Sequence, residues 1–211
     1  RHLVLLCKNE TGYRNLSYMV SMGFLEGFYI KPRIDMELLR AHSEGLIALS
    51  ACLAGEIPRL LRNGDYEGAK AHALEMQELF GEDSYYLELQ DHGLPEQKQI
   101  VAGILRLHEE TGIPLVCTND AREDAEMQDA LMCVQMGKLM EDDSRMRFET
   151  QEFYIKSEEE MRRLFPDCPD AFDNTVKIAD MCHVDFQFGV HHLPEFKLPE
   201  GETDGDAYFE K

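Results

Sequence analysis

Short apolar runs alternate with helical stretches through the first 120 residues, and this alternation constrains the fold more than any other feature of the chain. The runs have the length of strands and cover 2–8, 45–50, 85–89 and 113–118. Strands that alternate with helices are typical of parallel sheets joined by crossover helices. The sequence therefore predicts an α/β fold, built as an open doubly wound sheet or as a barrel, and periodicity alone does not separate the two.

Helix start and stop residues frame the stretches between these runs. Asp35 and Asp65 are suited to cap helix N-termini, and Asn63-Gly64 and Gly81 are suited to end helices. The expected helices follow residues 10–13 and cover 35–39, 56–62, 66–80 and 95–110.

The pattern changes after Asp120. Helical spacing returns over 123–136, and again over 157–165 and 170–182, where Ser157 and Glu160 have the spacing of a capping box. Residues 186–196 are loop-like, and 198–202 resemble a linker. The last sixty residues are therefore expected to form a smaller α-rich appendage.

Charge and hydropathy exclude some classes of protein. The 211 residues include 21 Lys+Arg and 41 Asp+Glu, which gives a formal net charge of −20. Such a surface repels a polyanion, so general electrostatic wrapping of nucleic acid is not expected. No window has the roughly 18 apolar residues of a membrane span.

The six cysteines are scattered and form no CxxC pair, so reduced thiols in a cytoplasmic protein are expected. The first apolar run begins without any start signal, which predicts a piece of a longer polypeptide. Because such a piece would leave sheet edges uncovered, marginal stability or self-association is also expected.

Polar residues next to the strand ends are the candidates for chemistry, because the carboxyl ends of parallel strands meet at one edge. His2 opens the first run, Cys52 follows the second, Asp91-His92 follow the third and Asp120 follows the fourth. His, Cys and Asp are ligands of Zn or Mn. A lone His or Cys is more often structural, and Asp120 fits equally well as the cap of the next helix.

Other clusters carry less information. The chain has no phosphate-binding GxxxxGK[ST] or GxGxxG loop and no GxSxG elbow. The acidic clusters at 141–143 and 158–160 are explained better by helix caps and solvated faces than by a metal. His191-His192 suit a metal ligand or a structural turn about equally well.

A run of motifs in a fixed order is more specific than any of these features. The motifs are HLVLL at 2–6, KNETGYRNL at 8–16, EGLIALSAC at 44–52, YLELQDHG at 86–93 and PLVCTND at 114–120, followed by 147–150, 153–154, 157–161, 173–176 and 192–194. Together they resemble the polymerase-and-histidinol-phosphatase (PHP) domain of bacterial replicative DNA polymerase III α subunits of the DnaE type.

This resemblance implies an incomplete (β/α)7 PHP barrel with a small α-rich appendage. Residues 1–145 would be the C-terminal majority of the PHP domain, 146–197 the link toward the polymerase palm and thumb, and 198–211 the start of the following segment. His2, Cys52 and Asp120 match metal-site positions of the family, and His92 would be a metal ligand or a residue that orients one. The metal would be Zn, Mn or a similar divalent ion.

For function, the resemblance implies part of a DNA-directed DNA polymerase whose PHP domain is a metal-dependent phosphodiesterase of the 3′–5′ exonuclease type, or the structural relic of one. The polymerase site, with its Mg, would lie outside this chain. Expected partners are the other domains of the α subunit, a separate proofreading exonuclease, and DNA and nucleotides bound by the longer protein; no membrane is expected.

The sequence differs from the family pattern in two places. The family's opening His-x-His segment is not in this sequence, and Ala121 runs directly into Arg122, where the family has a further histidine. The cluster is therefore expected to be incomplete here. One alternative is a non-catalytic scaffold that binds the exonuclease. A second is a free-standing PHP phosphoesterase, which the polymerase-type motifs at 147–194 oppose.

Overall fold

The computed structural model describes residues 1–211 except 122–124, 146–149, 191–195, 202 and 211. Its elements are β1 (Val4–Cys7), α1 (Glu10–Leu25), α2 (Met36–Ala41), β2 (Leu46–Leu49), α3 (Glu56–Arg62), α4 (Tyr66–Phe80), β3 (Tyr85–Leu89), α5 (Pro95–Thr111), β4 (Leu115–Cys117), α6 (Ala125–Met136), α7 (Glu158–Leu164), α8 (Pro169–Met181) and α9 (Gly205–Phe209). The predicted α/β class is confirmed. The turn expected at 191–194 lies outside the described residues.

The strands form one sheet, and the described residues give its order as β1-β2-β3-β4. Strands β2, β3 and β4 are parallel, as the alternation predicts. Strand β1 is antiparallel to β2, with Val4 opposite Leu49 and Cys7 opposite Leu46. The prediction of an all-parallel sheet was therefore wrong at β1. A closed barrel is not formed by the described strands.

The contacts between the end of β1 and the start of β2 continue the antiparallel arrangement. The Lys8 N–H, just past β1, donates to the carbonyl of Gly45 over 2.8 Å, so the chain leaves β1 at the place where it later enters β2. This approach needs two glycines: a Cβ on Gly12 would lie 1.9 Å from the Gly45 oxygen, and Gly45 itself has φ +75°. Left-handed backbone at Gly45 carries no steric penalty because glycine lacks a Cβ.

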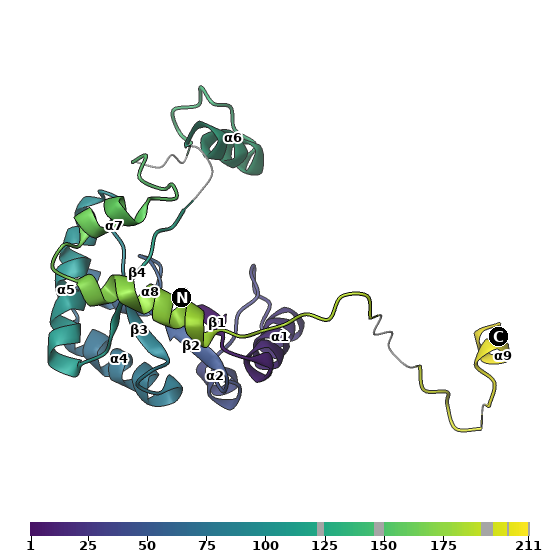
Figure 1. Cartoon of the computed structure of the whole chain (residues 1–211). Coiled ribbons are helices and arrows are strands. Elements are labelled where there is room, and N and C mark those ends of the chain that lie inside the picture. The colour runs from purple at the N-terminus through teal and green to yellow at the C-terminus, as the bar shows by residue number, and fades with distance from the viewer. Residues whose placement is uncertain (122–124, 146–149, 191–195, 202, 211) are drawn as a thin grey trace.

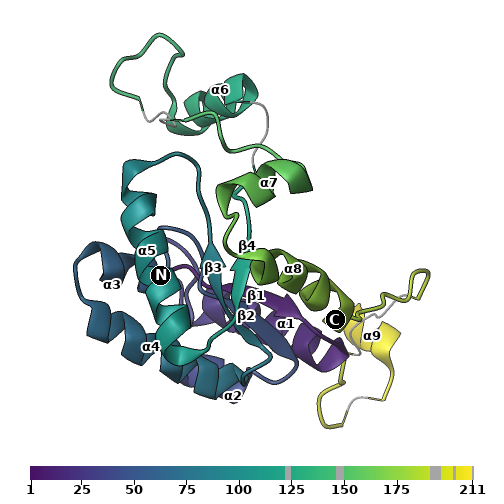
Figure 2. The ribbon, with the colours of Figure 1, turned by 60° about the vertical axis from the view of Figure 1, so that its left-hand side comes forward.

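Alternating strand residues divide the core between the two faces of the sheet. Leu46 and Ala48 join the larger cluster with buried side chains of α3, α4 and α5, whereas Ile47 and Leu49 join a smaller cluster with Ile178 of α8. Figure 2 shows α4 and α5 along one side of the sheet and α8 beside β4. The two-sided burial explains why these strands are nearly continuous apolar runs.

Local cap residues behave as the sequence predicts. The side chains of Asp35 and Asp65 accept the N–H groups of Leu38 and Gly68, and Ser157 and Glu160 form the predicted capping box of α7. Helix α6 stands apart from the sheet in both ribbon views (Figures 1 and 2). Among the described residues, no helix has the length and apolar content needed to span a membrane.

Candidate metal site at the strand ends

His2 and Cys52, which lie 50 positions apart in sequence, come together beside the end of β2. His2 forms an isolated bridge with Gly55, and its N–H donates to the carbonyl of Ala54 over 3.1 Å. Its Nδ1 then lies 3.8 Å from Sγ of Cys52. The turn that carries Cys52 is tight, since Ala51 has φ +66° and the Gly55 N–H donates to the Cys52 carbonyl over 2.7 Å. Two predicted ligands are thus neighbours.

Asp120 and His92 form a second pair, at the ends of β4 and β3. The backbone N–H of Asp120 donates to Nε2 of His92 over 3.2 Å. The His92 side chain is buried, and Gln97 contacts it twice: Oε1 accepts the His92 backbone N–H, and Nε2 lies 2.8 Å from Nδ1. Burial lowers the pKa of His92 below its ordinary value, although the nearby Asp120 charge acts in the opposite direction. The ring is therefore neutral at pH 7.

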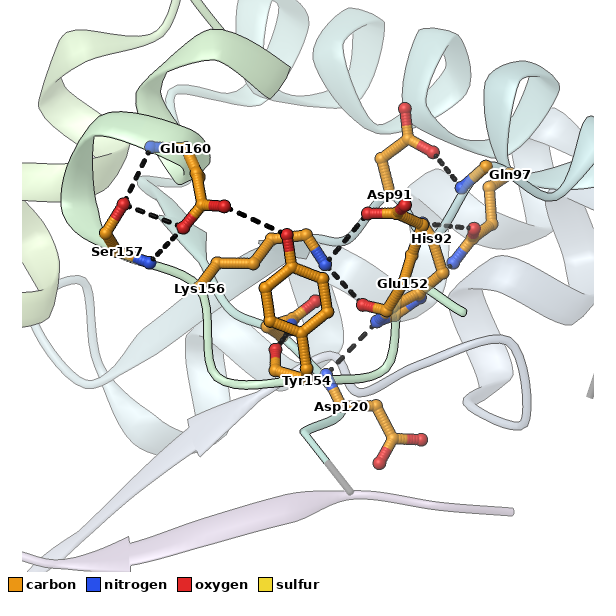
Figure 3. A network of polar contacts seen from close by, with 11 residues as sticks. Asp91, His92, Gln97, Asp120, Glu152, Tyr154, Lys156, Ser157 and Glu160 are labelled. Carbon is orange, nitrogen blue, oxygen red and sulfur yellow. Dashed lines mark hydrogen bonds and ion pairs between the residues drawn. The ribbon is translucent and has the colours of Figure 1, made fainter. Parts of the chain in front are cut away.

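The segment 150–157 covers this second pair, as Figure 3 shows. Phe153 stacks on the His92 ring, with 4.3 Å between ring centroids and 9° between planes. Lys156 is nearly fully buried, pairs with Glu152 over 3.2 Å and lies 4.1 Å from the centre of the Tyr154 ring. Asn119 donates its side-chain amide to the Tyr154 carbonyl. The segment thus links the end of β4 to the capping box of α7.

Glu88, on β3, is a buried carboxyl group that the sequence reasoning missed. Its Oε1 accepts hydrogen bonds from the Thr118 hydroxyl and, over 3.0 Å, from Nε2 of Gln90. Its Oε2 has no partner among the described atoms, and the same is true of Oε1 of Gln90 and Oδ1 of Asn119. Burial raises the pKa of Glu88, while the hydrogen bond from Thr118 acts in the opposite direction.

The donor set fits a metal chemically, but only half of it is assembled. Imidazole nitrogen, thiolate sulfur and carboxylate oxygen are all ligands of Zn. The His2–Cys52 pair supplies a nitrogen and a sulfur close together. Within the described ranges, however, no three His, Cys, Asp or Glu side chains form a group able to hold a metal ion. His92 has its Nε2 occupied by the Asp120 N–H, so in this arrangement it orients Asp120.

His2 also borders a cavity of about 660 Å³. Apolar side chains form most of its wall, several of them from α1 and α2, and Arg1, Arg33 and His72 contribute basic groups. The carboxylates of Asp35, Glu56 and Glu75 also line it, so its charge is mixed.

Residues 1–92, which include His2, Cys52 and His92 but not Asp120, match the PHP domain family. Over 98% of its length the chain is 46% identical to DNA polymerase III subunit alpha of Treponema pallidum, of which it covers 18%. The subunit of Borreliella burgdorferi is also 46% identical over 94% of this chain, and that of Thermus aquaticus is 44% identical over 96%. These matches cover 18% and 17% of the two relatives.

Residues 1–92 therefore match a PHP domain, and nearly the whole chain is similar to part of bacterial DNA polymerase III α subunits, as the motif order predicts. It spans less than a fifth of the length of these relatives. These similarities assign no role to His2, Cys52, His92 or Asp120.

Proposed function

We propose that the chain serves as the PHP domain of the catalytic α subunit of a bacterial replicative DNA polymerase III, in the cytoplasm. The observation that carries this proposal is the identity of 46% over 98% of the chain, which extends well beyond the match of residues 1–92 to the PHP domain family. DNA-directed polymerisation, with its Mg ions, DNA and nucleotides, would be the work of other domains of the longer protein. The net charge of −20 fits a supporting domain that leaves the main grip on DNA to others.

Within that protein, the strand-end edge would contribute to a divalent-metal site of the phosphodiesterase type. His2, Cys52 and Asp120 would bind Zn, Mn or a similar ion, and His92 would orient Asp120. Such an ion lowers the pKa of a bound water and stabilises charge that develops on phosphate oxygens. The 3.8 Å approach of His2 to Cys52 supports this assignment, because it presents a nitrogen and a sulfur together.

The sheet order supports a larger architecture for the longer protein. Strands β1 and β4 are the two ends of the described sheet, so closure into the (β/α)7 barrel would need further strands between them. We assign 1–145 to the PHP domain, 146–197 to the link toward the palm and thumb, and 198–211 to the following segment.

Metal analysis of the full-length protein tests the metal-site assignment. We expect bound Zn or Mn in the purified protein, weaker binding in His2→Ala and Cys52→Ala, and loss of any manganese-stimulated 3′-end hydrolysis in both. Cys168→Ala is the matched control, since Cys168 is also half-buried but packs against the core cluster. A metal content unchanged by the His2 and Cys52 variants would refute the assignment.

A second candidate is a non-catalytic scaffold that binds a separate proofreading exonuclease. The observation that favours it is that the described residues assemble only part of the donor set, together with the contacts of Gln97, Asp120 and Phe153 with His92. On this alternative, the wild-type protein would contain no metal, and His2→Ala would leave both polymerase rate and exonuclease affinity unchanged.

A further inference from the structure

Glu88 occupies the middle of the strand-end edge. It lies on β3, which pairs with β2 on one side and with β4 on the other. The turn after β2 carries Cys52, and the turn after β4 carries Asp120. A residue near the end of β3 is therefore next to both turns.

On the β2 side, the contact is made by the backbone of Glu88. Its N–H donates to Oγ of Ser50 over 2.8 Å, and Ser50 lies two residues before Cys52. Between them, Ala51 has φ +66°, a left-handed conformation that an alanine adopts only when its surroundings stabilise it. The Ala51 N–H is near enough to the Glu88 carboxylate to lower the pKa of that group.

On the β4 side, the contact is made by the side chain. Thr118, two residues before Asp120, donates its hydroxyl to Oε1 of Glu88. Nε2 of Gln90 lies 3.0 Å from the same oxygen and 2.9 Å from Oγ1 of Thr118, which closes a triangle of polar contacts. Glu88 is only 5% exposed, so water does not compete freely for these hydrogen bonds.

We propose that Glu88 is a positioning residue that fixes the Cys52 turn and the Asp120 turn relative to each other. The proposal rests on the metal-site function proposed above, because the two turns carry two of its expected ligands. Groups that hold metal ligands in place without binding the metal typically change its affinity when they are removed. Glu88 acts here through Ser50 and Thr118.

Two substitutions of Glu88 separate positioning from direct ligation in the full-length protein. Glu88→Gln keeps a carbonyl oxygen that can accept from Thr118 and Gln90, whereas Glu88→Ala removes the acceptor. We expect Glu88→Ala to weaken Zn or Mn binding about 10- to 100-fold and Glu88→Gln to retain affinity close to wild type. An equal loss in both variants would overturn the proposal, as would no loss in either.

A second measurement needs no metal. Hydrogen exchange of the metal-free protein reports how firmly the two turns are held, and we expect faster exchange at 50–52 and 118–120 in Glu88→Ala but not in Glu88→Gln. Unchanged exchange in Glu88→Ala would overturn the positioning role. If the wild type binds no metal, the metal-site function fails, and the exchange result still decides whether Glu88 couples the turns.

Two further variants test whether faster exchange in Glu88→Ala reflects the loss of these contacts or general misfolding. Thr118→Val removes the hydroxyl while leaving the carboxyl group in place, so it is expected to reproduce the Glu88→Ala exchange at 118–120; its failure to do so would count against the proposal. Tyr66→Phe is the matched control. It deletes a buried hydroxyl on α4, beneath Arg106, whose guanidinium lies 3.7 Å from the ring centre. Exchange at both turns is expected to stay at the wild-type rate.

Discussion

The backbone N–H of Asp120 donates to Nε2 of His92 over 3.2 Å, and Phe153 stacks on the face of the same imidazole with 4.3 Å between ring centroids. A single buried ring thus joins the end of β3, the end of β4 and the segment 150–157. These three parts are far apart in sequence, so the ring contributes to tertiary structure as well as to the site.

We therefore expect His92→Ala to lower the free energy of unfolding by about 1–3 kcal/mol, because the change removes an aromatic contact and leaves the part-buried backbone N–H of Asp120 without its acceptor. Hydrogen exchange at Asp120 and over 150–156 should also accelerate. Chemical denaturation and exchange mass spectrometry measure the two effects. His72→Ala, at a partly exposed position on α4, is the control, and an equal effect of both variants would contradict this role for His92.

Gly12 and Gly23, both on α1, should respond differently to the same substitution. A Cβ on Gly12 would meet the Gly45 oxygen at 1.9 Å, whereas a Cβ on Gly23 would find its nearest neighbour at 3.4 Å. Gly12→Ala is expected to destabilise the chain by about 1–3 kcal/mol, since backbone must move to accommodate it. Gly23→Ala should be neutral or stabilising by up to about 1 kcal/mol, because alanine favours helix. Thermal unfolding of the two variants checks this contrast.

The antiparallel direction of β1 is a feature of the fold that sequence patterns did not predict. Strand β3 is predicted correctly because its apolar run, bounded by turns, is a local property of 85–89. The antiparallel direction of β1 is accompanied by the close approach of Gly12 to Gly45, which are 33 positions apart and belong to no apolar pattern. Periodicity identifies strands, but it does not determine their pairing direction.

Some residues of the candidate site could be predicted from the sequence, and others could not. His2, Cys52 and Asp120 could be selected because they adjoin strand ends, and the structure brings the first two together. Glu88 could not be selected by that rule, because it lies inside an otherwise apolar strand. Its signal was the carboxylate itself, since a charged residue in a fully buried strand needs partners. Gln97 gave no signal, since an amide in the first turns of a helix is ordinary.

Thiol reactivity offers a test of burial at two of the cysteines. Burial raises the pKa of Cys117 to about 12, and its residue is 4% exposed in β4. At pH 8 only about one Cys117 in ten thousand is a thiolate, and the thiolate is the reactive form. Cys52 is half-buried on a turn, so we expect iodoacetamide to modify Cys52 well before Cys117 in the native chain. Peptide mass spectrometry measures the order in which the two cysteines are modified. Equal modification rates of Cys52 and Cys117 would show that burial in β4 does not protect Cys117.

Acid should weaken the contact between α4 and α5 through Glu110. Lys70 on α4 and Arg106 on α5 both pair with this carboxylate and lower its pKa from 4.5 to about 2. A carboxyl group whose pKa is lower in the folded state stabilises the fold above the unfolded pKa and loses that contribution as pH falls. Stability should therefore decline between about pH 4.5 and pH 2 in the wild type. Glu110→Gln should be less stable at pH 6 and should lose less over that interval, so that the two unfolding curves converge near pH 2. Glu109→Gln, at an exposed position on the same helix, is the control. If the stability of Glu110→Gln falls between pH 4.5 and pH 2 as much as that of the wild type, this role of Glu110 is contradicted.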